Sequence, residues 1–459
     1  MSTDPNPTPI RPYRPRSFFG PAVLITIGVI FLLRNAGYIS THTVMWWFAR
    51  YWPALLILWG VIKAAEYLWA RHNGEPAPRG IGPGGVVALI FLIIIGTSAT
   101  GLSRVDWDQF RTNTGWDDNT DFGFWQNHYD FTENLSQSVA EATQIKVLDG
   151  WGDITVNPSP DAQAHLYVHK SLHSDSQDQA SKLNESTHPQ FVQQGRIWVL
   201  DLTAGNFEHG RFNLDLQLPP NVPLVLNTRR GDISVNQRGA GVEMSTERGS
   251  LTVKGVKGNA TLNLHHGDTN VNGVTGNVDV NGSGGDITIS DVGGALNVNG
   301  EYGGDNHYNK IAGQVHFKSN RTDLAFAKLD GDFTMDRGDL RADNLAGPFK
   351  LDTRSKAVHL ENVSGDVRVD DTNASVEVTA KLPLGNIEIS NARGGIEVAL
   401  PASAGFQIDA ESKSGDIQSD FTLDVDNRRR DATARGTVGK GGPTVRLRAE
   451  RGTITIKKE

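Results

Sequence analysis

Two patterns of apolar positions divide the chain into a membrane part and a β part. The N-terminal part contains three long apolar runs, at 18–33, 45–62 and 86–102. From about residue 144 onwards, apolar residues instead fall at every second position in short stretches that Gly, Asn and Asp separate. Long apolar runs are typical of transmembrane helices, whereas alternation is typical of strands with one buried face.

The three runs predict transmembrane helices at about 18–39, 45–69 and 84–102. The last run, VVALIFLIIIGTSATGL, carries no charge and is close to the length that crosses a ~30 Å hydrocarbon core. The second is framed by rings at the depth of the lipid headgroups, among them Trp46, Trp47, Tyr67 and Trp69. Residues 1–17 then form a Pro/Arg-rich tail, and residues 103–136 form a juxtamembrane stalk.

The placement of Lys and Arg predicts the orientation of these helices. Three spans place six Lys and Arg residues on the side of the N-terminal tail and four on the other side. The first group is Arg11, Arg14, Arg16, Lys63, Arg71 and Arg79, and the second group is Arg34, Arg50, Arg104 and Arg111. Loops rich in Lys and Arg stay in the cytoplasm. We therefore expect a multi-pass protein of the cytoplasmic membrane with an extracytoplasmic C-terminal domain.

The alternating part of the chain repeats at a nearly fixed period, as in the stretch GNVDVNGSGGDITISDVGGALNVNG at 276–300. Glycines recur 18, 18, 19, 18, 16 and 18 residues apart, at Gly258, Gly276, Gly294, Gly313, Gly331, Gly347 and Gly365. An aliphatic residue precedes each glycine by two positions, and another apolar residue follows it by four. A flexible linker would not keep such a register.

This repeat predicts an all-β fold, a β-solenoid over residues 137–459 with coils of about 18 residues. Each coil would contain two short strands and two Gly-rich corners. The register places Phe317 and Met335 in one strand of successive coils, and Leu324 and Phe326 in the other strand. The coils at both ends are expected to be irregular, because they must cover an open hydrophobic end.

Gly-Asp pairs at the corners allow two interpretations. In the first, glycine supplies a positive φ and the aspartate side chain accepts a hydrogen bond from a nearby backbone N–H. In the second, Asp268, Asp286 and Asp305 stack on successive coils and bind Ca²⁺. The chain lacks a repeated GGxG motif, so turn chemistry is favoured and these three residues are weak metal candidates. The neighbouring His265 and His266 are expected to include one exposed and one packed ring.

Charge and cysteine content narrow the classes of partner. The net charge of −8 combines +5 for residues 1–102 with −13 for residues 103–459. An acidic body repels phosphate backbones, so we expect no nucleic-acid binding. The chain has no cysteine, which excludes disulfides and thiolate metal sites.

Two stretches of the sequence resemble known bacterial families. GDITVNPS at 152–159, LPPNVPLVLNTRRGDISV at 218–235 and GTVGKGGPTVRLRAERGTITI at 436–456 resemble the "putative adhesin" family of β-solenoid domains. GPAVLITIGVIFLLRNAGYIS at 20–40 and WWFARYWPALLILWGVIKAAEYL at 46–68 resemble the membrane region of LiaI/LiaF-like envelope-stress proteins. The resemblance implies a cell-envelope protein and supplies no catalytic motif.

No Walker loop, dinucleotide fingerprint, nucleophile elbow or HExxH motif occurs in the sequence. We therefore expect no enzyme activity and no cofactor, with Ca²⁺ as the one open possibility. Two functions remain open. The solenoid could bind an envelope protein or a glycan as an adhesion module anchored in the lipid bilayer. Alternatively, the protein could be an envelope-stress sensor that acts through a partner in the bilayer.

Overall fold

The computed structural model describes residues 127–459 except 140–141, 204, 206, 208–209 and 428–430, together with Pro53, Ala54, Ile57, Gly60, Val61, Ala64 and Leu68. The last group is helical and exposed, and it falls within the predicted span at 45–69. The predicted spans at 18–39 and 84–102 and the tail at 1–17 lie outside the described residues. In the part of the chain that the structure describes, no helix has the length and hydropathy to cross a membrane.

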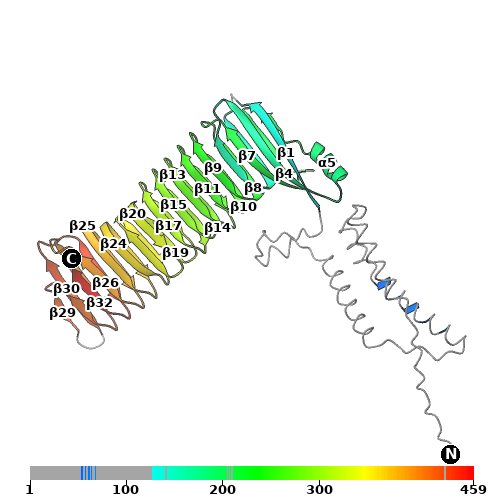
Figure 1. Ribbon diagram of the computed structural model, residues 1–459. Helices are drawn as coiled ribbons and strands as arrows, with labels where there is room; N and C mark the ends of the chain where they lie inside the picture. The colour runs from blue at the N-terminus through cyan, green and yellow to red at the C-terminus, as the bar shows by residue number, and fades with distance from the viewer. Residues whose placement is uncertain are drawn as a thin grey trace, which may run out of the picture. The chain divides into compact units, whose positions relative to one another are not determined.

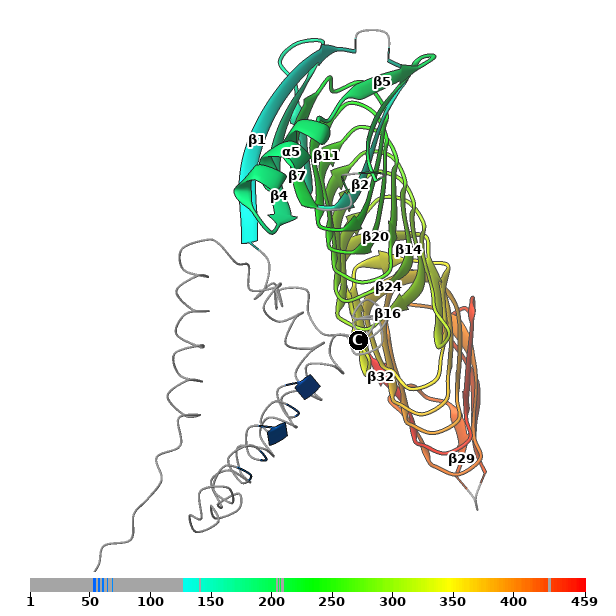
Figure 2. The same cartoon turned by 90° about the vertical axis from the view of Figure 1, so that its right-hand side faces the viewer.

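The larger of two compact units, Asp130–Leu172 with Leu183–Glu459, is a β-solenoid. Figures 1 and 2 show it as flattened coils that follow one another along a column. Its strands stack in two columns. In stack order the first column begins with β6 (Ile197–Leu202), β2 (Gln144–Trp151), β8 (Leu224–Arg230), β10 (Val242–Arg248), β12 (Ala260–Leu264), β14 (Val278–Gly284), β16 (Leu296–Tyr302) and β18 (Val315–Lys318).

The second column begins with β7 (Gly210–Leu218), β3 (Ile154–Pro158), β9 (Ile233–Arg238), β11 (Leu251–Val256), β13 (Thr269–Val274), β15 (Ile287–Val292) and β17 (Asn306–Ile311). Neighbouring strands of both columns run parallel, and equivalent residues of successive coils lie beside each other. Leu262 pairs with Val280 and Val280 with Val298, and all three side chains are buried. The predicted solenoid and its inward register are confirmed for these coils.

The corner that leads from the first column to the second is the Gly-Asp corner. Its glycines are required by the close approach of successive coils. Gly249 has a φ of +145°, and a Cβ atom there would lie 2.0 Å from the carbonyl oxygen of Gly231 in the preceding coil. Gly267 repeats the arrangement one coil further on, with its would-be Cβ 2.1 Å from the oxygen of Gly249. Only glycine satisfies both the backbone angle and the contact.

One coil runs against the direction of all the regular coils. β19 (Thr322–Phe326) is antiparallel to β18 in the first column, and β20 (Lys328–Met335) is antiparallel to β17 in the second. The chain enters this reversed coil, residues 322–335, through a hairpin turn at 319–321 and leaves it through another at 336–338. β21 (Asp339–Asp343) and β23 (Phe349–Thr353) then restore the original direction.

The reversal corrects the predicted register. Leu324 and Phe326 lie in the first column instead of the second, and Met335 lies in the second instead of the first. All three are buried as expected. The glycine spacing passes through the reversed coil almost unchanged, so it reports coil length without reporting chain direction.

Beyond the reversed coil the regular winding continues with longer strands. β22 (Leu345–Ala346) pairs with β20 and β24 (Ala357–Asp371), and both β24 and β25 (Val376–Asn391) pass around a corner and contribute to both columns. β26 (Ile396–Leu400) continues the second column.

At the C-terminal end the stacking order departs from the chain order. β31 (Thr444–Ala449) lies between β25 and β27 (Phe406–Ser412), and β32 (Ile454–Lys458) lies between β26 and β28 (Ile417–Ser419). The coil made last along the chain is thus inserted between two earlier coils. β30 (Ala432–Val438) and β29 (Asp424–Asp426) cover the outer side of β27 as antiparallel strands.

The N-terminal end shows the same two features. The coil β2–β3 lies between β6–β7 and β8–β9, although β6 and β7 follow it in the chain. β4 (Gln163–Ser174) and β5 (Phe191–Gln194) cover this end as antiparallel partners of β7 and β6, and β1 (Asn127–Ser138) pairs with β4. The helix α5 (Gln177–Ser186) follows β4 in the chain. The expectation of irregular end coils is confirmed. β1 begins within the segment predicted to be a stalk.

Candidate functional site

The aspartates of the Gly-Asp corner form a ladder of hydrogen bonds along the stack. The backbone N–H of Asp286 donates to Oδ1 of Asp268 at 2.9 Å, and the N–H of Asp305 donates to Oδ1 of Asp286 at 2.9 Å. Each carboxylate therefore accepts a hydrogen bond from one backbone N–H group of the next coil. This geometry agrees with the turn-chemistry interpretation, except that the N–H group belongs to the neighbouring coil and not to the same turn.

The ladder gives no support to the Ca²⁺ interpretation of Asp268, Asp286 and Asp305. Among the residues that the structure describes, no three carboxylate or histidine groups converge closely enough to hold a metal ion. Ca²⁺ takes six to eight oxygen ligands that surround the ion, whereas these carboxylates follow one another in a line.

The reversed coil opens the wall of the solenoid at the Gly-Asp corner. In the regular coils the chain crosses this corner from the first column to the second, as it does between β16 and β17. At the ends of β18 and β20 it turns back instead, through the hairpins at 319–321 and 336–338. The next crossing follows β23, at 354–356. A groove of about 1030 Å³ lies between these two crossings and the hairpins.

Cationic side chains surround this groove. They are Arg321, Arg337, Arg354 and Lys356, from the two hairpins and the crossing at 354–356. The imidazole rings of His265 and His266, from the crossing between β12 and β13, also line the groove. Arg337 Nε donates to the carbonyl oxygen of Gly303 at 3.1 Å, and Lys356 Nζ donates to the carbonyl oxygen of Asp336. Burial lowers the pKa of Lys356. Arg321 and Arg354 are exposed and form no ion pair with any described residue.

The two carboxylates in the groove are engaged in backbone hydrogen bonds. Glu301 accepts from the N–H of Asn320 at 2.6 Å, and Asp336 Oδ1 accepts from the N–H groups of Gly338 and Asp339 at 2.7 and 2.6 Å. These contacts fix the two hairpins in position. The guanidinium groups of Arg321 and Arg354 therefore face the groove without a carboxylate of their own.

The inner wall of the groove combines apolar and neutral polar groups. Phe317 and Met335 are almost fully buried there, and Tyr302 is partly exposed. The Tyr302 hydroxyl is buried and has no hydrogen-bond partner among the described residues. Burial raises the pKa of this phenol. The groove thus offers an aromatic face beside its charges.

The histidine pair at the rim differs from the expectation. His265 and His266 are both exposed, and both line the groove. The prediction of one packed ring is wrong because the two residues lie in the crossing between β12 and β13, outside the inward register of the strands.

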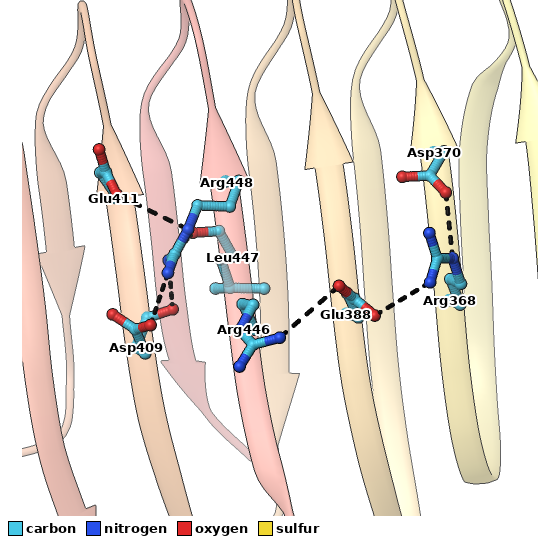
Figure 3. Close-up of polar contacts among 8 residues, drawn as sticks. All are labelled: Arg368, Asp370, Glu388, Asp409, Glu411, Arg446, Leu447 and Arg448. Atoms are coloured by element: carbon cyan, nitrogen blue, oxygen red, sulfur yellow. Dashed lines mark hydrogen bonds and ion pairs between the residues drawn. The ribbon is translucent and has the colours of Figure 1, made fainter.

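A second group of charged residues lies near the C-terminal end, across β24, β25, β31 and β27 (Figure 3). In this charged row Arg368 contacts Asp370 at 3.1 Å and Glu388 at 3.3 Å, and Arg446 contacts Glu388 at 3.8 Å. Arg448 contacts Asp409 and Glu411, and its hydrogen bond lowers the pKa of Asp409. Every member has an internal partner, so the charged row connects the inserted β31 with its neighbours.

The class of protein that these features define is a β-solenoid with a cationic groove in its wall, preceded by an apolar N-terminal region. Residues 312–457 match the Toastrack DUF4097 domain, and residues 18–63 match the LiaI-LiaF-like transmembrane region. One region of the chain thus matches a toastrack domain and another matches a LiaI-LiaF-like transmembrane region, in agreement with the resemblance seen in the sequence. It is a membrane-associated protein.

Solved structures similar to the chain include two bacterial proteins. A "putative cell adhesion protein" from Clostridium sporogenes is 11% identical, with 72% of this chain and 100% of that chain covered and a TM-score of 0.17. A "putative adhesin" from Bacteroides fragilis is 11% identical, with 72% and 97% covered and a TM-score of 0.18. No curated protein matches the chain.

The groove is the feature that sequence reasoning missed. Two hairpin signals were present, SNR at 319–321 and DRG at 336–338, because Ser, Asn, Asp and Gly favour tight turns. The nearly constant glycine spacing instead indicated that the same winding continues through both turns. A rise in aromatic content at the same place, at Phe317, Phe326 and Phe333, was a further available signal.

Proposed function

We propose that this protein is a cell-envelope binding module, anchored in the cytoplasmic membrane, whose solenoid lies outside the membrane and binds an envelope or surface component without chemical turnover. The groove beside the reversed coil is the proposed binding site. The observation that carries this proposal is the opening of the wall where the reversed coil turns back, with Arg321 and Arg354 exposed at the opening and without ion-pair partners among the described residues.

The extracytoplasmic position is part of the proposal. The Lys/Arg bias and the acidic C-terminal body support it. Protease added to intact spheroplasts should digest the solenoid and spare an epitope placed in the tail at 1–17. Protection of the solenoid would reverse the orientation.

Binding can be tested by blocking the groove in the full chain. Asn320 lies at the hairpin that lines the groove, and Asn299 is an exposed asparagine on the outer face of β16. With the protein in phosphatidylcholine nanodiscs, co-sedimentation with purified bacterial cell walls should be lost in Asn320→Trp and retained in Asn299→Trp. Equal binding by both variants and the unsubstituted protein would contradict the use of the groove.

A second candidate function is an envelope-stress regulator that acts through a partner protein in the bilayer. The match of residues 18–63 to the LiaI-LiaF-like transmembrane region favours it. Replacing residues 1–102 by an unrelated multi-pass anchor separates the two functions. The binding module should keep its attachment to cell walls after the exchange, whereas a regulator should lose its effect on the stress response.

A further inference from the structure

The charge of the groove is opposite to that of the domain around it. Residues 103–459 carry a net charge of −13, whereas Arg321, Arg337, Arg354 and Lys356 face only Glu301 and Asp336 in the groove. We propose, on the basis of the function above, that the ligand of the groove is an anionic carbohydrate polymer, one that carries carboxylate or phosphate groups on sugar units.

The hydrogen bonds of the groove indicate an anionic ligand. Arg337 and Lys356 donate to backbone carbonyl oxygens, and among the described residues none of the four cations forms an ion pair with Glu301 or Asp336. Four cations therefore face two carboxylates, which leaves the groove with an excess of positive charge. Arg321 and Arg354 retain all their donors for a ligand. Guanidinium groups bind carboxylates and phosphates in a two-pronged geometry, which gives both affinity and orientation.

The strand pairing disfavours a peptide as the ligand. One common way for an extended peptide to bind is by adding a strand to a free sheet edge. β18 pairs with β16 and β19, and β20 pairs with β17 and β21, so these strands present no free edge to the groove. Strand addition is therefore closed to a ligand of this groove, and the charged and polar side chains of the lining are the groups that would recognise it.

The lining of the groove suits sugar units. The Asn320 amide supplies a neutral donor and acceptor, and the Tyr302 ring supplies an apolar face. The hydroxyl groups of Ser283, Ser319 and Ser355 donate to backbone carbonyl oxygens, so their oxygen atoms are offered to a ligand as acceptors. The volume of about 1030 Å³ lies at the upper end of the range for small-ligand sites, roughly 300–1,000 Å³. Such a groove accommodates several linked units instead of a single ion.

The test measures binding by calorimetry with the full chain in phosphatidylcholine nanodiscs. The probes are oligogalacturonate, poly(ribitol phosphate), neutral maltohexaose and poly-glutamate. We expect at least one of the first two to bind, more weakly at higher salt, and maltohexaose to show no binding. The two anionic probes distinguish a carboxylate-bearing ligand from a phosphate-bearing one. The double variant Arg321→Glu/Arg354→Glu should weaken binding by roughly tenfold or more, the scale of losing hydrogen bonds to a charged group.

The matched control is Lys254→Glu/Lys257→Glu, which makes the same change in net charge at exposed positions outside the groove. It should leave affinity unchanged, and thermal melting should show that both double variants fold. An equal loss in the two variants, binding of maltohexaose, or tighter binding of poly-glutamate would overturn the proposal. If no carbohydrate binds while Asn320→Trp still abolishes binding to cell walls, the ligand class is wrong and the proposed function stands.

Discussion

Glycine and aspartate have different structural roles at the Gly-Asp corner. Glycine permits the backbone of one coil to touch the carbonyl group of the preceding coil, and aspartate accepts the N–H of the next coil. Both roles repeat with each coil because the corners stack. The alternation of these polar residues with Val, Ile and Leu thus reflects stacking requirements at the corners and burial in the strands.

The close approach of successive coils predicts that substitution by alanine lowers the free energy of unfolding by different amounts at two glycines with positive φ. Gly249→Ala adds a Cβ that meets a backbone oxygen at 2.0 Å, whereas Gly255→Ala, at φ +68°, meets nothing closer than 3.7 Å. Gly255→Ala should cost about 1–2 kcal/mol, the strain of a left-handed backbone alone. Gly249→Ala should cost clearly more, because the coils must also separate. Urea unfolding of both variants measures the difference, and equal costs would contradict the stacking argument.

The buried carboxyl group of Asp149 should make the free energy of unfolding of the domain depend on pH. Its carboxyl group is 1% exposed, and burial raises its pKa to about 7. In the unfolded chain the group ionises near pH ~4. Between these two values the folded state holds a proton that the unfolded state has released. The free energy of unfolding should therefore fall as the pH rises from about 4 to 7, and stay level above that interval.

The matching experiment compares Asp149→Asn with Asp215→Asn at an exposed carboxylate. At pH 8 the buried asparagine should stabilise the domain, with a gain on the order of a few kcal/mol, because no charge is buried. At pH 4 it should have little effect. Thermal melting across this pH range checks the prediction, and a pH-independent effect of Asp149→Asn would contradict it.

At the scale of elements, the reversed coil is held by aromatic packing. Phe333 stacks on Tyr308 with ring centroids 5.2 Å apart and contacts Phe326 at 5.7 Å. Phe326 in turn lies 6.2 Å from Phe349. These rings take the inward positions that Val, Ile and Leu occupy in most of the regular coils.

Shortening the central ring should therefore destabilise this coil. Phe333 is fully buried, so Phe333→Ala should cost about 3–5 kcal/mol, and Phe333→Leu should cost less because it leaves a smaller cavity. Hydrogen exchange followed by mass spectrometry should show faster exchange over 315–353, with 242–292 unchanged, since coils interact mainly with their neighbours. Uniform acceleration along the whole column would contradict local cooperativity.

The strands and their inward faces could be predicted from the sequence, because alternation depends only on which residues are buried. Leu262, Val280 and Val298 are examples in which the period alone was sufficient. Chain direction could not be predicted from that period, since a strand buries the same alternate residues whichever way it runs. The groove depends on the direction of one coil, and it therefore required the structure.

At the scale of the whole domain, the inserted coil β31–β32 joins the C-terminal coils. The exposed ion pairs of the charged row contribute about 0–1 kcal/mol each. The buried side chains of Val445, Leu447, Ile454 and Ile456 contribute more, at about 1.5–3 kcal/mol for each fully buried aliphatic group. Apolar burial therefore holds the insert, and the charged row helps to set its register.

Removing residues 444–459 should open a gap inside the column instead of shortening its end. We expect limited proteolysis to cut within 396–438 in the truncated chain, while the coils at 224–311 stay protected. Leu447→Asp should give the same pattern, because it buries a charge, whereas the outward Arg446→Gln should leave the digestion unchanged. Trimming confined to the outermost strands β29 and β30 would contradict the inserted order.

The inserted coil also has a consequence for synthesis. The ribosome makes β27 and β28 before the coil that separates them from β25 and β26, so these strands cannot take their final neighbours while the chain is still growing. Pairing them early with β25 and β26 would close the space that β31 and β32 later need. A nascent chain that stalls before residue 444 therefore exposes the strand edges of β25, β26, β27 and β28 that β31 and β32 would otherwise cover.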